Sequence, residues 1–144
     1  MHGSYKQSTD AYSGSYAIEL QTDNSLFGGV EAGEAATGQN VPGGMSGGFP
    51  YTTQIDTLVY YYKYLPADPN DNAECYVLLK KNGVQIGQGQ ASMTISPSYK
   101  KVMIPFNAGS PPDSINFNFR SSKYPYLPSY VGSDFKMDNM KSEN

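Results

Sequence analysis

Short runs of alternating apolar and polar residues recur along this chain, and glycine or proline separates them. The clearest run covers residues 57–64, where Leu58 and the tyrosines at every second position share one side. Lys63 falls on the opposite side. Because alternate side chains of a strand point to opposite faces, we expect the Leu58 side in the core and Lys63 outside. Helical spacing is not sustained over any window of about 11 residues, so the pattern predicts an all-β fold.

Seven further segments have strand character, with residues 30–37 the least regular. Asn82-Gly83 separates two of them and is the strongest short-range signal for a β-hairpin. The further expected strands are 16–22, 30–37, 74–80, 84–90, 100–106, 114–120 and 134–140. The residues expected to face inward are Tyr16, Ile18 and Leu20 or their neighbours, then Val102, Ile104, Phe106, Ile115, Phe117, Phe119, Phe135 and Met137. About eight antiparallel strands are typical of a jelly-roll β-sandwich.

The chain has 144 residues, enough for one domain with its own core. We divide it into residues 1–7, a leading strand or a non-native start, and one sandwich domain over residues 8–144. No stretch approaches the roughly 20 apolar residues of a membrane span. We expect a module of a larger exported protein, secreted or at the cell surface, whose partners include the other domains of the parent chain.

Charge argues against nucleic acid as a partner. Only 16% of the residues are charged and the formal net charge is −3. Lysines occur as isolated pairs, Lys80-Lys81 and Lys100-Lys101, so no basic stripe is available to neutralise phosphates. The place of charged residues is taken by 15 glycines, 10 prolines and 13 tyrosines, a composition typical of extracellular β-domains that bind polar ligands.

Catalytic constellations are scarce. The single histidine, His2, lies in the leading segment, which removes Ser/His/Asp and Cys/His arrangements and a zinc ligand set. The single cysteine, Cys75, alternates with Val77 and Leu79 and is expected in the core. A glycosidase would need two carboxylates about 5–9.5 Å apart. The acidic residues that could form such a pair are scattered along the chain, so we predict that the protein is not an enzyme. These residues are Glu19, Glu31, Glu34, Asp56, Glu74 and Asp113.

Three segments together resemble a known family. Residues 8–18 resemble the opening of galactose-binding-like jelly rolls, with Ser13-Gly14 ahead of Tyr16-Ala17-Ile18. Gly48-Phe49-Pro50-Tyr51, the run from Tyr60 to Tyr64 and the closing segment 132–140 resemble a bacterial domain family named for carbohydrate metabolism or carbohydrate binding. Three positions depart from its pattern: Tyr51 replaces Phe, Tyr60 stands where a small residue is usual, and Asn139 replaces a second Asp.

The resemblance implies a galactose-binding-like fold in a secreted bacterial protein, and it implies a structural Ca²⁺ ion. Such domains often hold calcium where the first turn meets the last strand, and calcium takes 6–8 oxygen ligands. Asp10 and Asp138 would supply carboxylates, and Tyr12 and Gly14 would supply backbone carbonyls. The alternative is that Asp10 forms an Asx-turn and that Asp138 caps a bulge or is solvated.

A glycan site would combine flat aromatic rings with amide, carboxylate or guanidinium groups. On the outward faces of the strands the candidates are Tyr61, Lys63, Tyr76, Asn118 and Arg120. The aromatic loop with Tyr124, Tyr126 and Tyr130 is the slightly favoured place, although these tyrosines could instead close the end of the sandwich. We expect a non-catalytic carbohydrate-binding accessory module that binds a glycan or polysaccharide. The alternative is a structural or adhesive spacer.

Overall fold

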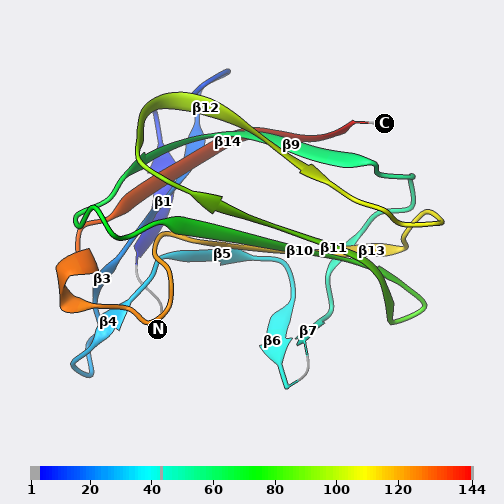
Figure 1. Cartoon of the computed structure of the whole chain (residues 1–144), viewed down its shortest axis with the longest axis horizontal. Coiled ribbons are helices and arrows are strands. Elements are labelled where there is room, and N and C mark those ends of the chain that lie inside the picture. The colour runs from blue at the N-terminus through cyan, green and yellow to red at the C-terminus, as the bar shows by residue number, and fades with distance from the viewer. Residues whose placement is uncertain (1–3, 43, 144) are drawn as a thin grey trace.

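A computed structural model describes residues 4–42 and 44–143 and confirms an all-β sandwich of the jelly-roll kind. Two antiparallel sheets face each other (Figure 1). The first sheet has the order β1 (Ser4–Ser8), β2 (Ala17–Gln21), β14 (Asp134–Glu143), β9 (Thr57–Leu65) and β12 (Ser96–Pro105). The second sheet has the order β11 (Val84–Met93), β10 (Ala73–Lys81), β13 (Ser114–Arg120) and β5 (Glu34–Ala36), with β8 (Phe49–Pro50) also paired to β13.

Smaller elements complete the described part of the chain. Two short hairpins are β3 (Asp23–Asn24) with β4 (Val30–Glu31) and β6 (Gln39–Val41) with β7 (Gly44–Ser46). In Figure 1 the β6–β7 hairpin extends from the second sheet, away from the first sheet. One 3₁₀ helix, η1, spans Pro128–Tyr130. Within residues 4–42 and 44–143 no helix is long and apolar enough to cross a membrane.

The Asn82-Gly83 hairpin is confirmed. Lys81 pairs with Val84, which leaves these two residues as the turn between β10 and β11. Both have positive φ angles, 52° and 76°, as a type I′ turn requires. The side chain of Asp113 holds the turn from the next strand connection, because its Oδ2 accepts the backbone N–H of Asn82 at 2.8 Å.

The predicted inner face of β9 is also confirmed. Leu58, Tyr60, Tyr62 and Tyr64 are all buried in the core. The phenol hydroxyls stay hydrogen-bonded inside: Tyr60 donates to Met93 Sδ at 3.1 Å and Tyr64 donates to the Ser121 carbonyl at 2.7 Å. Burial raises the pKa of both phenols. Tyr62 likewise donates to the Thr94 carbonyl at 3.2 Å. Since buried polar groups without partners are destabilising, these three bonds explain how three tyrosines fit into one core.

The remaining inward predictions hold with two exceptions. Buried residues include Leu20, Ile104, Ile115, Phe119, Phe135 and Met137, and partly buried ones packed against them include Val102, Phe106 and Phe117. Cys75 is buried, and burial raises the pKa of its thiol to about 12. The first exception is Ile18, which lies beside Met137 on the inner face but is 43% exposed, because the second sheet ends before covering it. The second is Tyr16, which precedes β2 and is also exposed.

A buried network of hydroxyl groups joins separate chain segments around Asp71, which is 4% exposed. The carboxylate accepts hydrogen bonds from Ser122 at 2.6 Å and Ser133 at 2.7 Å. Thr22 shares a hydrogen bond with Ser122, and also with Ser121. Four separate chain segments therefore meet at one buried carboxylate.

Candidate functional site

The outer face of the second sheet combines an aromatic ring with several amides. Tyr76 lies directly opposite Gln90, and Leu78 opposite Gln88, in the pairing of β10 with β11. Directly paired residues share a face. Tyr76 is 41% exposed and Gln88 and Gln90 are exposed. The side chains of Tyr76, Leu78, Gln88 and Gln90 line a hollow of about 290 Å³, in which an apolar surface is flanked by amides.

The same face continues across β13 with more deeply buried polar groups. Asn118 lies opposite Tyr76, and Arg120 opposite Glu74. Asn118 Nδ2 donates to Glu34 Oε1 at 3.2 Å, and Arg120 Nε lies 3.4 Å from Glu34 Oε2. Asn118 was expected to be an exposed ligand residue, but it is only 2% exposed. The acceptor of its amide, Glu34, belongs to the edge strand β5, which lies within the predicted segment 30–37.

Three buried polar atoms of this face lack a hydrogen-bond partner among the described residues. They are Asn116 Oδ1, Asn118 Oδ1 and Arg120 Nε, although Arg120 Nε still lies in the ion pair with Glu34. Buried polar atoms are rarely left unpaired in folded proteins, and an unpaired one calls for a water or a ligand. All three atoms belong to β13, the strand next to Tyr76.

Glu74 adds a titratable group to the face. Burial raises its pKa, against the opposing charge of Arg120. Burial also raises the pKa of Tyr126, whose ring lies near Arg120. A half-buried carboxyl, a guanidinium and a phenol beside an exposed tyrosine can donate to and accept from hydroxyl groups. Sequence reasoning missed Glu74, Gln88 and Gln90 as a group. The register shift between Leu79 and Lys80, which the Asn82-Gly83 turn does not predict, brings Gln88 and Gln90 onto the face of Tyr76.

The aromatic loop divides into exposed and buried members. Tyr124 is 76% exposed, and its ring meets the ring of Tyr126 edge-on with centroids 5.6 Å apart. Tyr130, expected as an exposed platform, is only 3% exposed. It belongs to η1, which turns its ring inward, so Tyr130 closes the end of the sandwich. Tyr126 alone connects the loop to the Arg120 face.

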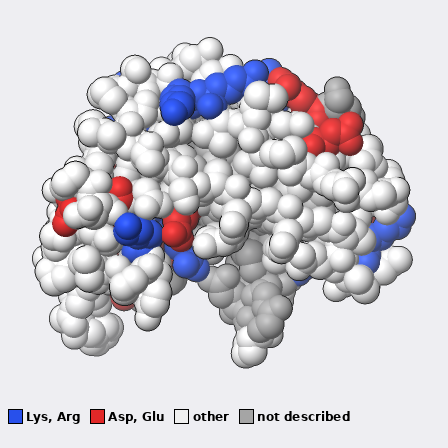
Figure 2. All heavy atoms as spheres, in the orientation of Figure 1, with Lys and Arg blue, Asp and Glu red and all other residues white. Residues whose placement is uncertain are grey.

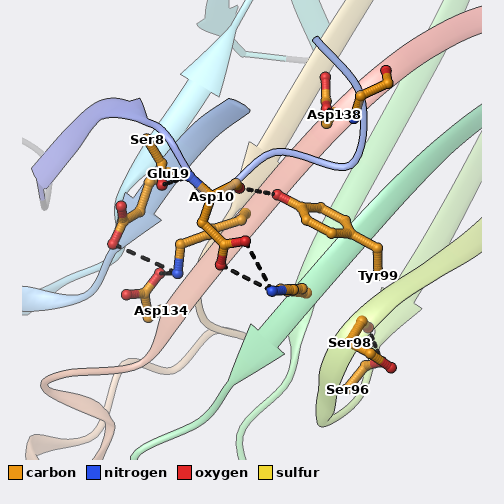
Figure 3. Close-up of polar contacts among 11 residues, drawn as sticks. Ser8, Asp10, Glu19, Ser96, Ser98, Tyr99, Asp134 and Asp138 are labelled. Atoms are coloured by element: carbon orange, nitrogen blue, oxygen red, sulfur yellow. Dashed lines mark hydrogen bonds and ion pairs between the residues drawn. The ribbon is translucent and has the colours of Figure 1, made fainter. Parts of the chain in front are cut away.

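Tyr61 and Lys63 lie on the outer face of the first sheet, as expected, but residues 9–15 cross this face as a strap. Tyr12 of the strap stacks on Tyr61, and both oxygens of the Asp10 carboxylate lie 2.9 Å from Lys63 Nζ. Figure 3 shows the Tyr99 hydroxyl pointing to the Asp10 backbone, where it donates to the carbonyl at 2.5 Å. The strap therefore covers the predicted ligand positions Tyr61 and Lys63, because its own side chains occupy them.

The same strap holds the residues expected to bind calcium. It does meet the last strand, since the Ser13 N–H donates to Asp138 Oδ2 at 2.9 Å. The Asp10 carboxylate, however, is occupied by the Lys63 ammonium, and Asp138 Oδ1 accepts the Asn139 N–H at 2.6 Å. Within the described residues, no group of three or more His, Cys, Asp or Glu side chains could hold a metal. Lys63 thus neutralises the Asp10 carboxylate in this arrangement, and a calcium site with Asp10, Tyr12, Gly14 and Asp138 remains a prediction from the sequence.

Charged side chains are sparse on the surface. Figure 2 shows a mostly uncharged face on which lysine and arginine form a short row at the top and small separate groups elsewhere. This distribution agrees with the formal net charge of −3. An uncharged surface with tyrosines and amides suits a neutral polar ligand better than a polyanion.

Comparison with known proteins identifies the class of fold. A structure of carbohydrate-binding modules of the β-sandwich superfamily, described as promiscuous in specificity, matches at a TM-score of 0.55 with 11% identity over 99% of this chain and 53% of that chain. A family 11 carbohydrate-binding module from Clostridium thermocellum, in complex with a β-1,3-1,4-mixed-linked tetrasaccharide, matches at 0.51 with 16% identity, covering 95% and 79%.

An arabinose-bound α-L-arabinofuranosidase, MgGH51, matches at a TM-score of 0.52 with 10% identity over 94% of this chain and 21% of the enzyme. The chain thus spans about a fifth of that enzyme and about half of the promiscuous module's chain. No family model matches the sequence, and no curated protein matches it significantly. The chain has the β-sandwich fold of carbohydrate-binding modules.

Proposed function

We propose that this protein is a non-catalytic carbohydrate-binding module whose glycan site is the outer face of the second sheet. The observation that carries the proposal is the hollow lined by Tyr76, Leu78, Gln88 and Gln90. A sugar ring has an apolar C–H face and a hydroxyl rim. The exposed ring of Tyr76 suits the first, and the flanking glutamine amides suit the second.

The neighbouring strand supplies further hydrogen-bonding groups. Glu74 lies on β10, next to the strand of Gln90, and Arg120 lies opposite Glu74 on β13. Asn118 Oδ1, which has no hydrogen-bond partner among the described residues, adds an acceptor on β13. A glycan lying across β11, β10 and β13 would contact the ring first and then these groups.

The roles of the acids support the proposed lack of catalysis. Both oxygens of Glu34 are used within the protein, one by Asn118 and one by Arg120. Among the described carboxyls of this face, Glu74 then remains without such a pair, while a glycosidase needs two. The fold is also found as about a fifth of a glycosidase chain, which suits an accessory domain.

We also propose that the module belongs to an exported bacterial protein. The support is the resemblance of residues 8–18, 48–64 and 132–140 to a domain family of secreted proteins, together with the tyrosine-rich, charge-poor composition. Expression of the full-length parent gene followed by fractionation of cells and medium tests this. Retention of the mature protein inside the cell contradicts it.

Binding to polysaccharides tests the proposed site. Affinity electrophoresis with mixed-linked β-glucan, xylan, mannan and arabinan identifies the ligand, and calorimetry measures its affinity. Tyr76→Ala should weaken binding about tenfold or more, since it removes the stacking surface. Phe27→Ala, at an aromatic side chain that is 91% exposed and outside the hollow, should leave binding unchanged. Lack of binding across plant, algal and host polysaccharides favours a spacer role, and release of reducing sugar contradicts the non-catalytic assignment.

A further inference from the structure

The sandwich is open along one edge, where the inner face of the first sheet extends past the second sheet. Tyr5 pairs with Leu20, and Gln7 pairs with Ile18, in the β1–β2 ladder. Leu20 is a fully buried core residue. Because directly paired side chains share a face, Tyr5, Gln7 and Ile18 also point to the core side. Tyr5 is nevertheless 76% exposed and Ile18 43% exposed.

This exposed part of the inner face forms a cleft of about 750 Å³. Its floor includes Ala17, Ile18 and Met137, and the short edge strand β5 forms the opposite wall with Glu34, Ala35 and Ala36. Tyr16 and Met140, 55% and 40% exposed, lie at its rim. The volume lies within the range of about 300–1,000 Å³ that is usual for small-molecule sites. Core-facing apolar side chains left in contact with water indicate a surface that another molecule covers.

The charged groups around the cleft already have partners in the protein. Glu34 is held by Arg120 and Asn118, and the Lys6 ammonium lies 3.8 Å from Glu19. Asp138 accepts the backbone N–H groups of Ser13 and Asn139. A charged ligand would therefore find no free counter-charge among the described lining residues.

The polar groups that remain are neutral. In the described part of the chain, the amides of Gln7 and Asn139 and the phenols of Tyr5 and Tyr16 have no protein hydrogen-bond partner, and all four side chains are exposed. An acyl chain would leave these amides and phenols unused. A neutral molecule with apolar faces and several hydroxyls would use both the Ile18 floor and the amide and phenol rim.

We propose that this edge cleft is a second ligand site, which takes a short neutral oligosaccharide. It is separate from the outer-face site, because none of the residues lining the Tyr76 hollow lines the cleft. Occupied together, the two sites would attach the module to a polysaccharide at two points, and linked sites gain overall affinity without new contacts.

Amide chemical shifts during an oligosaccharide titration test the second site. The probes are the mixed-linked β-1,3-1,4 tetrasaccharide and short β-1,4-linked glucan, xylan and mannan oligosaccharides. We expect shifts at Gln7, Ala17, Ile18 and Asn139 that saturate with the sugar. Their absence with every probe overturns the second site, whatever happens around Tyr76. Shifts at the same amides with a fatty acid or an unrelated extended peptide, and not with sugars, overturn the proposed ligand class.

Matched variants separate the two sites. Gln7→Ala and Tyr16→Ala replace exposed side chains, so the fold should be retained, and each should weaken cleft binding about five- to tenfold with the Tyr76 response intact. Tyr76→Ala should weaken binding at the Tyr76 face and leave the cleft shifts and their affinity unchanged. If Gln7→Ala and Tyr16→Ala leave the cleft shifts and their affinity unchanged in folded protein, the proposal is wrong.

Discussion

The ring of Tyr12 lies parallel to the ring of Tyr61, with centroids 3.8 Å apart and planes 8° apart. One ring belongs to the strap and the other to the central strand β9. The strap residue thus covers the flat tyrosine surface that a sugar could otherwise use. Tyr99 approaches the same ring of Tyr12 edge-on, at 5.9 Å, so the strap is fixed by an aromatic group of three.

Tyr12→Ala should loosen the strap without unfolding the sandwich. The stacking contact with Tyr61 is lost, and the nearby hydrogen bond from the Ser13 N–H to Asp138 should open more often. We expect Tm to fall by a few degrees and hydrogen exchange at the Ser13 amide to accelerate. Phe27→Ala removes an aromatic ring that is 91% exposed and should change neither. Unchanged exchange at Ser13 in Tyr12→Ala would show that the stack does not hold the strap.

The strap also shows where prediction from sequence ends. Period two correctly assigned the inner residues Tyr60, Ile115 and Phe119, because a side chain's face depends only on its position along one strand. Which segment covers the outer face depends on chain crossings that have no local periodicity. Tyr61 and Lys63 were therefore placed on the correct face but wrongly expected to be free for a ligand.

For the polar residues of the second sheet, too, alternation predicted the face of each side chain but not its neighbours from other segments. Asn118 and Arg120 were placed on the outer face from alternation, and that is where they lie. Glu34 of β5, a strand of three residues within the predicted segment 30–37, accepts a hydrogen bond from Asn118. The hollow at Tyr76 was out of reach of sequence analysis. The Asn82-Gly83 turn alone would pair Tyr76 with Gly89, and the register shift between Leu79 and Lys80 pairs it with Gln90 instead.

Asp71 is the buried carboxylate on which four segments depend, and no pattern in the sequence distinguishes it from its exposed neighbours. Asp71→Ala removes the buried acceptor of the Ser122 and Ser133 hydroxyls. We expect a loss of about 3 kcal/mol in the free energy of unfolding, measured by urea denaturation. Asp68→Ala, in the same loop but only half-buried, should have a smaller effect. Equal losses for the two variants would contradict a special role for the buried network.

Asp134 gives the stability of the domain a specific dependence on pH. Burial and the neighbouring Glu19 raise its pKa from 3.8 to about 6, against the attraction of Lys136. Between about pH 4 and pH 6 the folded state therefore holds a proton that the unfolded state has released. Stability should fall as pH rises through this window, because the folded state binds more protons.

Asp134→Asn should flatten that part of the profile, with Tm followed from pH 4 to pH 8. Asp56→Asn, at an exposed position, should keep the wild-type slope between pH 4 and pH 6. A wild-type slope in Asp134→Asn would show that Asp134 does not carry the effect.

Lys63 supplies the positive charge at Asp10 that the resemblance assigns to calcium. With both carboxylate oxygens 2.9 Å from the ammonium, we expect the wild-type Tm to be unchanged by added calcium or by EDTA. In Lys63→Met the Asp10 carboxylate loses its counter-charge, so calcium should raise Tm more in this variant than in wild type. A clear calcium-dependent shift in wild type, reversed by EDTA, would restore the calcium site predicted from the sequence.

Gly38 is required by space as well as by backbone conformation. Its φ of +85° favours glycine, and a Cβ there would lie 2.5 Å from Asn116 Nδ2 and against the backbone oxygen of Ser46. Gly28 has a similar φ of +79° but open space around it. Gly28→Ala should therefore lower the free energy of unfolding by about 1 kcal/mol, because only the unfavourable backbone conformation contributes there.

Gly38→Ala adds a steric clash, so we expect a loss of about 2 kcal/mol or more in the free energy of unfolding. The chain that packs on Asn116 would have to move away from β13, which should also disturb the neighbouring Asn118 and weaken glycan binding at the Tyr76 face. Denaturation and calorimetry of the two variants measure both effects. If Gly38→Ala costs no more than Gly28→Ala, the close approach of this segment to Asn116 does not matter for stability, and its proposed support of the site is wrong.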